Sequence, residues 1–175
     1  MRRRLAYAVA FGLLWTTAPA NAGPYIVIVQ QEGKNVIATG RGSIDVTGLS
    51  FLSVVNNAVF VSPAQVQMVT GIASSIDAYE KTSTVTLRFG NGGFTLARSG
   101  SGDNVGFRAN GGGMYEIFVP HNYVSDTALF GSATYDNATL ASLGLTPGTY
   151  TLTWGSDPDQ SFTLHIVAAA ARPNR

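Results

Sequence analysis

The chain has 175 residues, a net charge of +1 and no cysteine. The absence of cysteine excludes thiol catalysis and thiolate metal sites, and it leaves the fold to rest on its apolar core without disulfides. Beyond the N-terminal MRRR the basic residues are scattered rather than clustered, which disfavours a nucleic-acid-binding protein.

The first 22 residues have the three parts of a secretory signal peptide. They begin with the basic MRRR, continue with the apolar LAYAVAFGLLW and end with small residues in APANA. The apolar run is too short to cross a bilayer, which takes about 20 residues. We therefore expect cleavage after Ala22, export to the periplasm or the cell exterior, and no stable membrane anchor. Without MRRR, the chain from Gly23 onward has a net charge of −2.

After this segment, short strand patterns alternate with glycine-rich turns, which is typical of an all-β sandwich or barrel. PYIVIVQQ (24–31) is apolar on both faces and predicts a central strand, which turns through EGK into NVIATG (35–40). Weaker strand patterns follow in SFLSVVNNAVFVSP, AQVQMVTG, MYEIFVP and ALFGSATY. A second hairpin is predicted over residues 83–98, because STVTLRF places Val85, Leu87 and Phe89 on one face and GNGG offers a tight reversal into FTLAR.

The clearest hairpin lies at residues 145–167, LTPGTYTLTWGSDPDQSFTLHIV, with SDPDQ as its turn. Its large apolar side chains alternate onto one face of the two strands: Tyr150, Leu152, Trp154, Phe162, Leu164 and Ile166. Just before it, ATLASLGL predicts one short helical turn that ends at Gly144. We predict one antiparallel β-sandwich domain, jelly-roll or Ig-like, over residues 23–167, followed by a short disordered tail at 168–175.

No catalytic pattern in the sequence is complete. His165 falls on the threonine face of the last strand, and the loop residue His121 has Asp126 nearby, but no G-x-S-x-G serine elbow occurs. DPDQS lacks the glycine and the closing glutamate of a calcium loop, and SGSGD and NGGGM lack the context of a phosphate-binding loop. We predict no catalytic residue, no metal site and no cofactor. A hydrolase that uses His121 and turn carboxylates is the third alternative.

Exposed aromatic rings are the remaining candidates for ligand binding, because sugars stack on such rings. Alternation assigns Trp154 to the core, which leaves Tyr79, Tyr115 and Tyr123, together with the loop residue His121. A carbohydrate-binding module is therefore the second alternative, on the basis of compartment and fold rather than of a recognised site.

Three stretches of the chain carry a family resemblance: VIVQQEGKNVIATGRGSIDVTGLSF, YEIFVPHNYVSDTALFGSATY, and LFGSATYDNATLASLGLTPGTYTLTWG followed by DQSFTLHI. Together they resemble a group of small exported bacterial proteins that are associated with the PEP-CTERM sorting signal. The resemblance implies a Gram-negative source, a β-rich fold and a role in the cell envelope or the extracellular polymer matrix. The sorting tail itself is absent, because only AAAARPNR follows Val167, so we expect free secretion or periplasmic residence.

The leading prediction is a non-catalytic secreted or envelope protein that acts through its β surface. Its partners would be further copies of itself or extracellular polysaccharide. Weakly charged sheet edges support this hypothesis, because another strand can add to such an edge.

Overall fold

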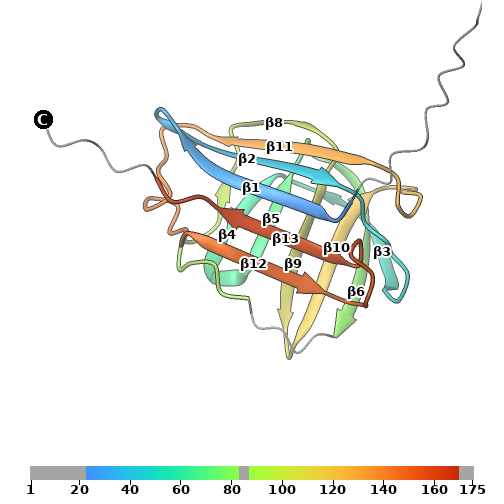
Figure 1. The fold of residues 1–175 in the computed structure, drawn as a ribbon. Helices are drawn as coiled ribbons and strands as arrows, with labels where there is room; N and C mark the ends of the chain where they lie inside the picture. Colours follow the sequence, from blue (N-terminus) through green and yellow to red (C-terminus); the bar gives the residue numbers. More distant parts are fainter. Residues whose placement is uncertain (1–22, 83–86, 170–175) are drawn as a thin grey trace, which may run out of the picture.

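The computed structural model describes residues 23–82 and 87–169, so the predicted signal peptide and residues 170–175 of the predicted tail lie outside the described residues. The described chain folds into strands β1 to β13, which form two sheets (Figure 1). The sheets pack face to face, and their strands cross at a steep angle (Figure 1). The predicted all-β sandwich is confirmed. In the described ranges, no helix is long and apolar enough to cross a membrane.

The first sheet has six strands. In sheet order they are β12 (Gly148–Thr153), β13 (Ser161–Ile166), β1 (Tyr25–Glu32), β2 (Asn35–Gly42), β11 (Leu129–Tyr135) and β8 (Ser99–Gly102). Strands β1 and β13 run parallel, with Tyr25 opposite Phe162 and Val29 opposite Ile166, whereas the other strand pairs are antiparallel. The first and last strands therefore lie side by side in the middle of this sheet.

The second sheet has seven strands. In sheet order they are β3 (Ser50–Asn57), β6 (Ser74–Thr82), β10 (Met114–Pro120), β9 (Val105–Gly111), β5 (Gln67–Thr70), β4 (Phe60–Ser62) and β7 (Thr95–Leu96). A short 3₁₀ turn, Pro63–Gln65, joins β4 to β5.

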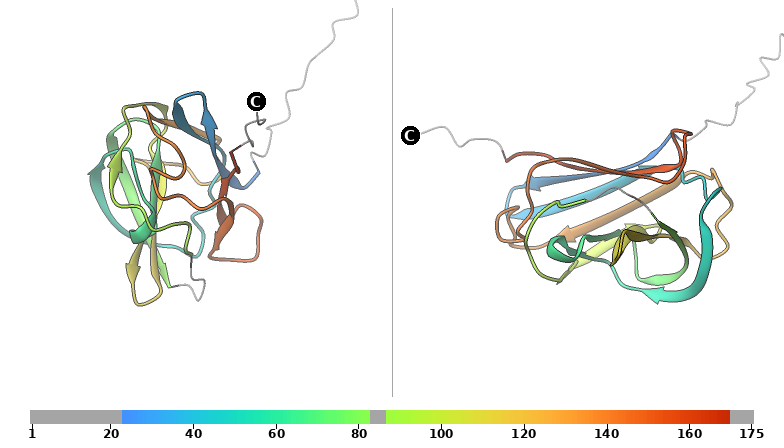
Figure 2. Two further views of the ribbon diagram at one scale, coloured as in Figure 1. Left: turned by 90° about the vertical axis from the view of Figure 1, so that its left-hand side faces the viewer. Right: turned by 90° about the horizontal axis from the view of Figure 1, so that it is seen from below.

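This second sheet is strongly curled. Only Ala58 and Val59 join β3 to β4, although four strands lie between them in the sheet. A link of that length spans at most about 11 Å, whereas five strand spacings of a flat sheet measure about 24 Å. The sheet must therefore bend back on itself, and β3 comes to lie on the side away from the six-stranded sheet (Figure 2).

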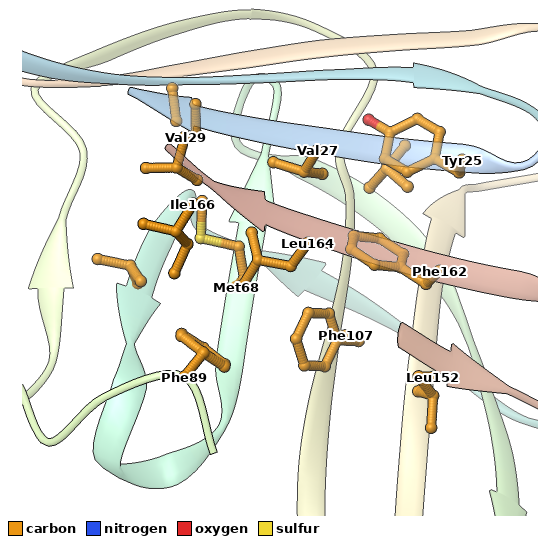
Figure 3. Close-up of a cluster of buried hydrophobic side chains, with 14 of the residues drawn as sticks. Tyr25, Val27, Val29, Met68, Phe89, Phe107, Leu152, Phe162, Leu164 and Ile166 are labelled. Carbon is orange, nitrogen blue, oxygen red and sulfur yellow. The ribbon is translucent and has the colours of Figure 1, made fainter. Parts of the chain in front are cut away.

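The main core fills the space between the two sheets (Figure 3). The ring of Phe162 on β13 lies 5.3 Å from that of Tyr25 and 4.9 Å from that of Phe107 on the opposite sheet. The predicted hairpin at 145–167 is confirmed, and Trp154 is buried with its Nε1–H donating to the Asp45 carbonyl at 2.8 Å. His165 is exposed, as alternation predicted.

The far face of the seven-stranded sheet carries a second buried cluster, formed by Phe60, Val69, Ile76, Ala78 and Phe118. These side chains alternate with those that point into the main core, so both faces of this sheet bury apolar groups. The curl of the sheet encloses the second cluster, since β3 bends over the far face (Figure 2).

The predicted hairpin over residues 83–98 is wrong. Residues 87–89 are not in a strand, β7 pairs with β4 instead of with this segment, and residues 83–86 lie outside the described residues. Alternation still assigned the buried positions correctly, because Leu87 and Phe89 are in the core. The glycine-rich GNGG does not form a tight reversal, because the Asn91 and Gly92 N–H groups both donate to the Gly144 carbonyl.

Two further predictions are only partly right. Strand β1 is central in its sheet, but Ile26 and Ile28 are exposed because nothing in the described chain covers the outer face of that sheet. The predicted helical turn forms as a single turn. The Leu143 N–H donates to the Thr139 carbonyl at 3.0 Å, and Gly144 ends the turn with φ +63.

Removal of the hydroxyl group from each of two buried tyrosines is expected to have different effects on stability. The Tyr25 hydroxyl bonds to the Thr70 hydroxyl of the opposite sheet at 3.2 Å, whereas the buried Tyr135 hydroxyl has no partner among the described residues. Burial raises the pKa of both phenols above the usual value. We expect Tyr25→Phe to lower the free energy of unfolding by about 1 kcal/mol, and Tyr135→Phe to leave it unchanged or raise it by about 1 kcal/mol. Urea unfolding of the two variants measures both values, and equal losses in both would contradict this account.

Candidate functional site

Strand β3 is the edge of the seven-stranded sheet. It pairs with β6 along its length, from Ser50 opposite Glu80 to Asn57 opposite Ser74, and no strand of the described chain pairs with its other side. Backbone N–H and C=O groups along such an edge are free to bond to another strand.

The side chains of β3 are unusually apolar for an exposed strand. The exposed fractions are 58% for Phe51, 45% for Leu52, 47% for Val54 and 42% for Val55. A β-bulge between Phe51 and Ser53 interrupts the register, whereas Ser53 to Asn57 pair regularly with β6. The regular part, with Val54 and Val55 on its two faces, is therefore the part that an added strand can extend.

Strand β3 itself carries no charged residue. The sequence contains none between Asp45 and Asp77, although sheet edges are commonly protected by charges, prolines or short strands. The other three edges in the described ranges are different. Strand β12 presents threonines, β8 has the sequence SGSG, and β7 is only two residues long. Among the described strands, β3 is the only long apolar edge.

The three candidate tyrosines do not form an exposed platform. Tyr115 is only 5% exposed and its hydroxyl accepts from the Leu87 N–H at 3.3 Å, so the expectation that it is exposed is wrong. Tyr79 and Tyr123 are half-buried against the main core, and partial burial raises the pKa of each phenol. Tyr115 points inward because it shares a face of β10 with Ile117 and Val119.

His121 is paired with a carboxylate, but not with the one that its sequence neighbourhood indicates. Its Nδ1 lies 2.7 Å from Oδ1 of Asp77 on β6, whose Oδ2 accepts from the Asn122 N–H at 3.0 Å. Asp126 instead donates its backbone N–H to the Ile44 carbonyl. In the part of the chain that the structure describes, the recorded side-chain partner of the His121 ring is the Asp77 carboxylate.

Several aspartates of the turns lie close together: Asp45, Asp126, Asp157 and Asp159. Asp45 accepts from the Thr47 N–H at 2.8 Å, the Ser125 hydroxyl at 3.0 Å and the Gln160 amide at 2.9 Å. Partial burial raises the pKa of Asp45, but these hydrogen bonds outweigh it and hold the pKa below its usual value. Partial burial and the charges of Asp45, Asp159 and Asp157 raise the pKa of Asp126. Within the described ranges, no group of histidines and carboxylates is arranged to hold a metal ion.

Comparison of the chain with protein-family models, with curated proteins and with solved structures found no match. The resemblance to the PEP-CTERM-associated group therefore stays a prediction.

A pocket of about 740 Å³ lies beside the β1–β2 turn, lined by Gln31, Lys34, Asn137, Leu140, Leu145 and Pro147 among others. The Gln31 amide is fully used, because it donates to backbone carbonyls and accepts from the Leu140 N–H. The lining contains no carboxylate, histidine or aromatic ring. This pocket is therefore a weaker functional candidate than the β3 edge.

Sequence reasoning did not single out β3. Two signals were present: a long uncharged stretch, and the run FLSVVNN, whose apolar residues do not alternate strictly. Neither signal says whether a strand lies at an edge, because that depends on the order of strands in the sheet.

Proposed function

We propose that this chain is a non-catalytic, exported protein of the cell envelope or extracellular matrix that binds further copies of itself through the free edge of β3. The observation that carries the proposal is the combination of an unpaired edge, exposed apolar side chains and absence of charge in a single strand. The composition of residues 1–22 supports export.

The association would join two identical edges. A two-fold symmetric contact pairs each β3 antiparallel with its copy, so that the two seven-stranded sheets become continuous. Residues Ser53 to Asn57 would supply the backbone hydrogen bonds, and Val54 and Val55 would be buried against the same residues of the second copy. Addition of a strand to an exposed edge gains affinity from main-chain bonds and specificity from alternate side chains.

The test is the state of assembly of the protein as a function of concentration. We expect light scattering to show a concentration-dependent dimer or larger species for the unmodified protein, and a Val54→Lys variant to weaken association at least tenfold. A charge on the edge prevents pairing because it would be buried without a partner. Thr151→Lys on β12, an exposed edge position of the other sheet, is the matched control and should not change association. A strictly monomeric protein, or an equal effect of both substitutions, would overturn the proposal.

A further inference from the structure

A row of polar side chains crosses the far face of the seven-stranded sheet. Directly opposite one another on neighbouring strands are Glu80 on β6, Glu116 on β10, Arg108 on β9 and Gln67 on β5. Opposite side chains on paired strands have Cβ atoms about 5 Å apart. The row therefore brings four planar hydrogen-bonding groups together beside the second buried cluster.

The centre of this row is rigidly held. Glu116 is only 1% exposed, and its Oε1 accepts from Arg108 Nη2 at 3.0 Å and from the Asn110 amide. Its Oε2 lies 2.8 Å from the same Nη2 in an ion pair but has no hydrogen-bond partner among the described residues. The guanidinium of Arg108 lies 5.6 Å from the centre of the Phe118 ring. The Arg108 side chain is nevertheless 44% exposed, so part of it is open to solvent although its Nε is buried.

Folding stability does not account for this arrangement. Burial removes the hydration of the Glu116 carboxylate, and such an ion pair adds little stability relative to apolar side chains of similar volume. In addition, the buried Arg108 Nε has no hydrogen-bond partner among the described residues. A donor left unpaired in a buried position costs stability rather than adding to it, so folding stability alone does not explain why Arg108 stands here.

An exposed aromatic ring packs against the second buried cluster. Phe118 belongs to the same buried cluster as Phe60, and the ring of Phe94 lies 4.7 Å from that of Phe60. Phe94 is exposed, as is Leu96, which pairs with Phe60 across β7 and β4. The far face thus combines hydrogen-bonding groups with an exposed ring.

We infer that this face is a binding site for a neutral polysaccharide, independent of the proposed self-association through β3. The polar row carries two carboxylates and one guanidinium, so its net charge of −1 repels polyanions. Sugar hydroxyls both donate and accept, which suits carboxylates, a guanidinium and amides in a row. The apolar face of a sugar ring packs against an aromatic ring such as that of Phe94.

The geometry favours binding over cleavage. Two carboxyl groups about 5 to 5.5 Å apart can cleave a glycoside with retention, provided both reach the scissile bond. Here Glu116 is buried and both of its oxygens contact Arg108. Glu80 is the carboxylate of the pair that remains available to a ligand.

The test measures retardation of the native protein in gels that contain dextran, laminarin or galactomannan, with alginate as the polyanion. We expect at least one of the three neutral polymers to retard the protein, and alginate to have no effect. Glu80→Gln removes a charged acceptor and Phe94→Ala removes the exposed ring, so each should weaken binding at least tenfold. Both residues lie at the surface of the face, and an unchanged melting temperature will show that the variants fold.

Phe130→Ala is the matched control, because Phe130 is an exposed ring on the outer face of the other sheet. It should change binding less than twofold. Repeating the measurement with Val54→Lys separates polysaccharide binding from assembly through β3. The inference is overturned if no neutral polymer binds, if alginate binds preferentially, or if Phe94→Ala and Phe130→Ala behave alike.

Discussion

Replacement of Phe162 by alanine is expected to lower the free energy of unfolding by about 3–5 kcal/mol, because it leaves a cavity where both sheets meet. Phe162 is almost completely buried, and its ring contacts Tyr25 on the same sheet and Phe107 on the other (Figure 3). Its strand also joins the first strand of the chain to the last hairpin. The fluorescence of Trp154, at the end of β12, reports urea unfolding of this region.

Thr163→Ala is the matched control for this loss. Thr163 follows Phe162 on β13 but points to the outer face, where its hydroxyl bonds to that of Thr151 at 3.0 Å. Loss of one such hydrogen bond costs at most about 1 kcal/mol. If Phe162→Ala and Thr163→Ala had similar effects, the assignment of the two faces of β13 would be wrong.

Period-two alternation was sufficient to identify the hairpin that contains these two residues. In residues 148–166 the side chains of Leu152, Phe162 and Leu164 lie on one face, and local turn chemistry sets the register. The parallel pairing of this hairpin with β1 was not predicted. It joins residues more than 130 positions apart, and no local pattern specifies which distant strand will be the neighbour.

The failure at residues 83–98 has a different cause. The glycines of GNGG are compatible with a tight turn, but they also allow close backbone approach, and the Gly144 carbonyl takes the Asn91 and Gly92 N–H groups. A Cβ on Gly92 would lie only 1.9 Å from the Leu143 carbonyl oxygen. Gly92 is therefore needed because the backbone of residues 143–144 approaches it closely, and not because the chain reverses there. Sequence alone does not distinguish these two reasons for a glycine.

The two candidate surfaces lie beyond sequence analysis for a related reason. Free strand edges are defined by the order of strands in a sheet, so β3 could be recognised as a strand but not as an edge. The glutamate in MYEIFVP stands out within an apolar strand, but its partner Arg108 becomes visible only with the β9–β10 register. That register includes a shift after Met114, beside three glycines with positive φ.

Arg108→Ala is expected to destabilise the fold by about 3–5 kcal/mol, because it leaves the Glu116 carboxylate buried without its cation. The Asn110 amide is then the remaining side-chain partner of that carboxylate. The double variant Arg108→Met, Glu116→Leu removes both charges and fills a similar volume, so we expect its stability to equal or exceed that of the unmodified protein. Urea unfolding of the matching single variants Arg108→Met and Glu116→Leu and of the double variant gives the coupling free energy.

A loss below about 1 kcal/mol in Arg108→Ala would show that water replaces the guanidinium at Glu116, and that solvent reaches this carboxylate once Arg108 is removed. The double variant also separates stability from binding. If the ion pair serves the polysaccharide site, Arg108→Met, Glu116→Leu folds at least as stably as the unmodified protein but loses retardation by the neutral polymer. If the pair only organises the sheet, the double variant keeps its binding. A charged pair that can be replaced without loss of stability, but not without loss of binding, belongs to the site rather than to the fold.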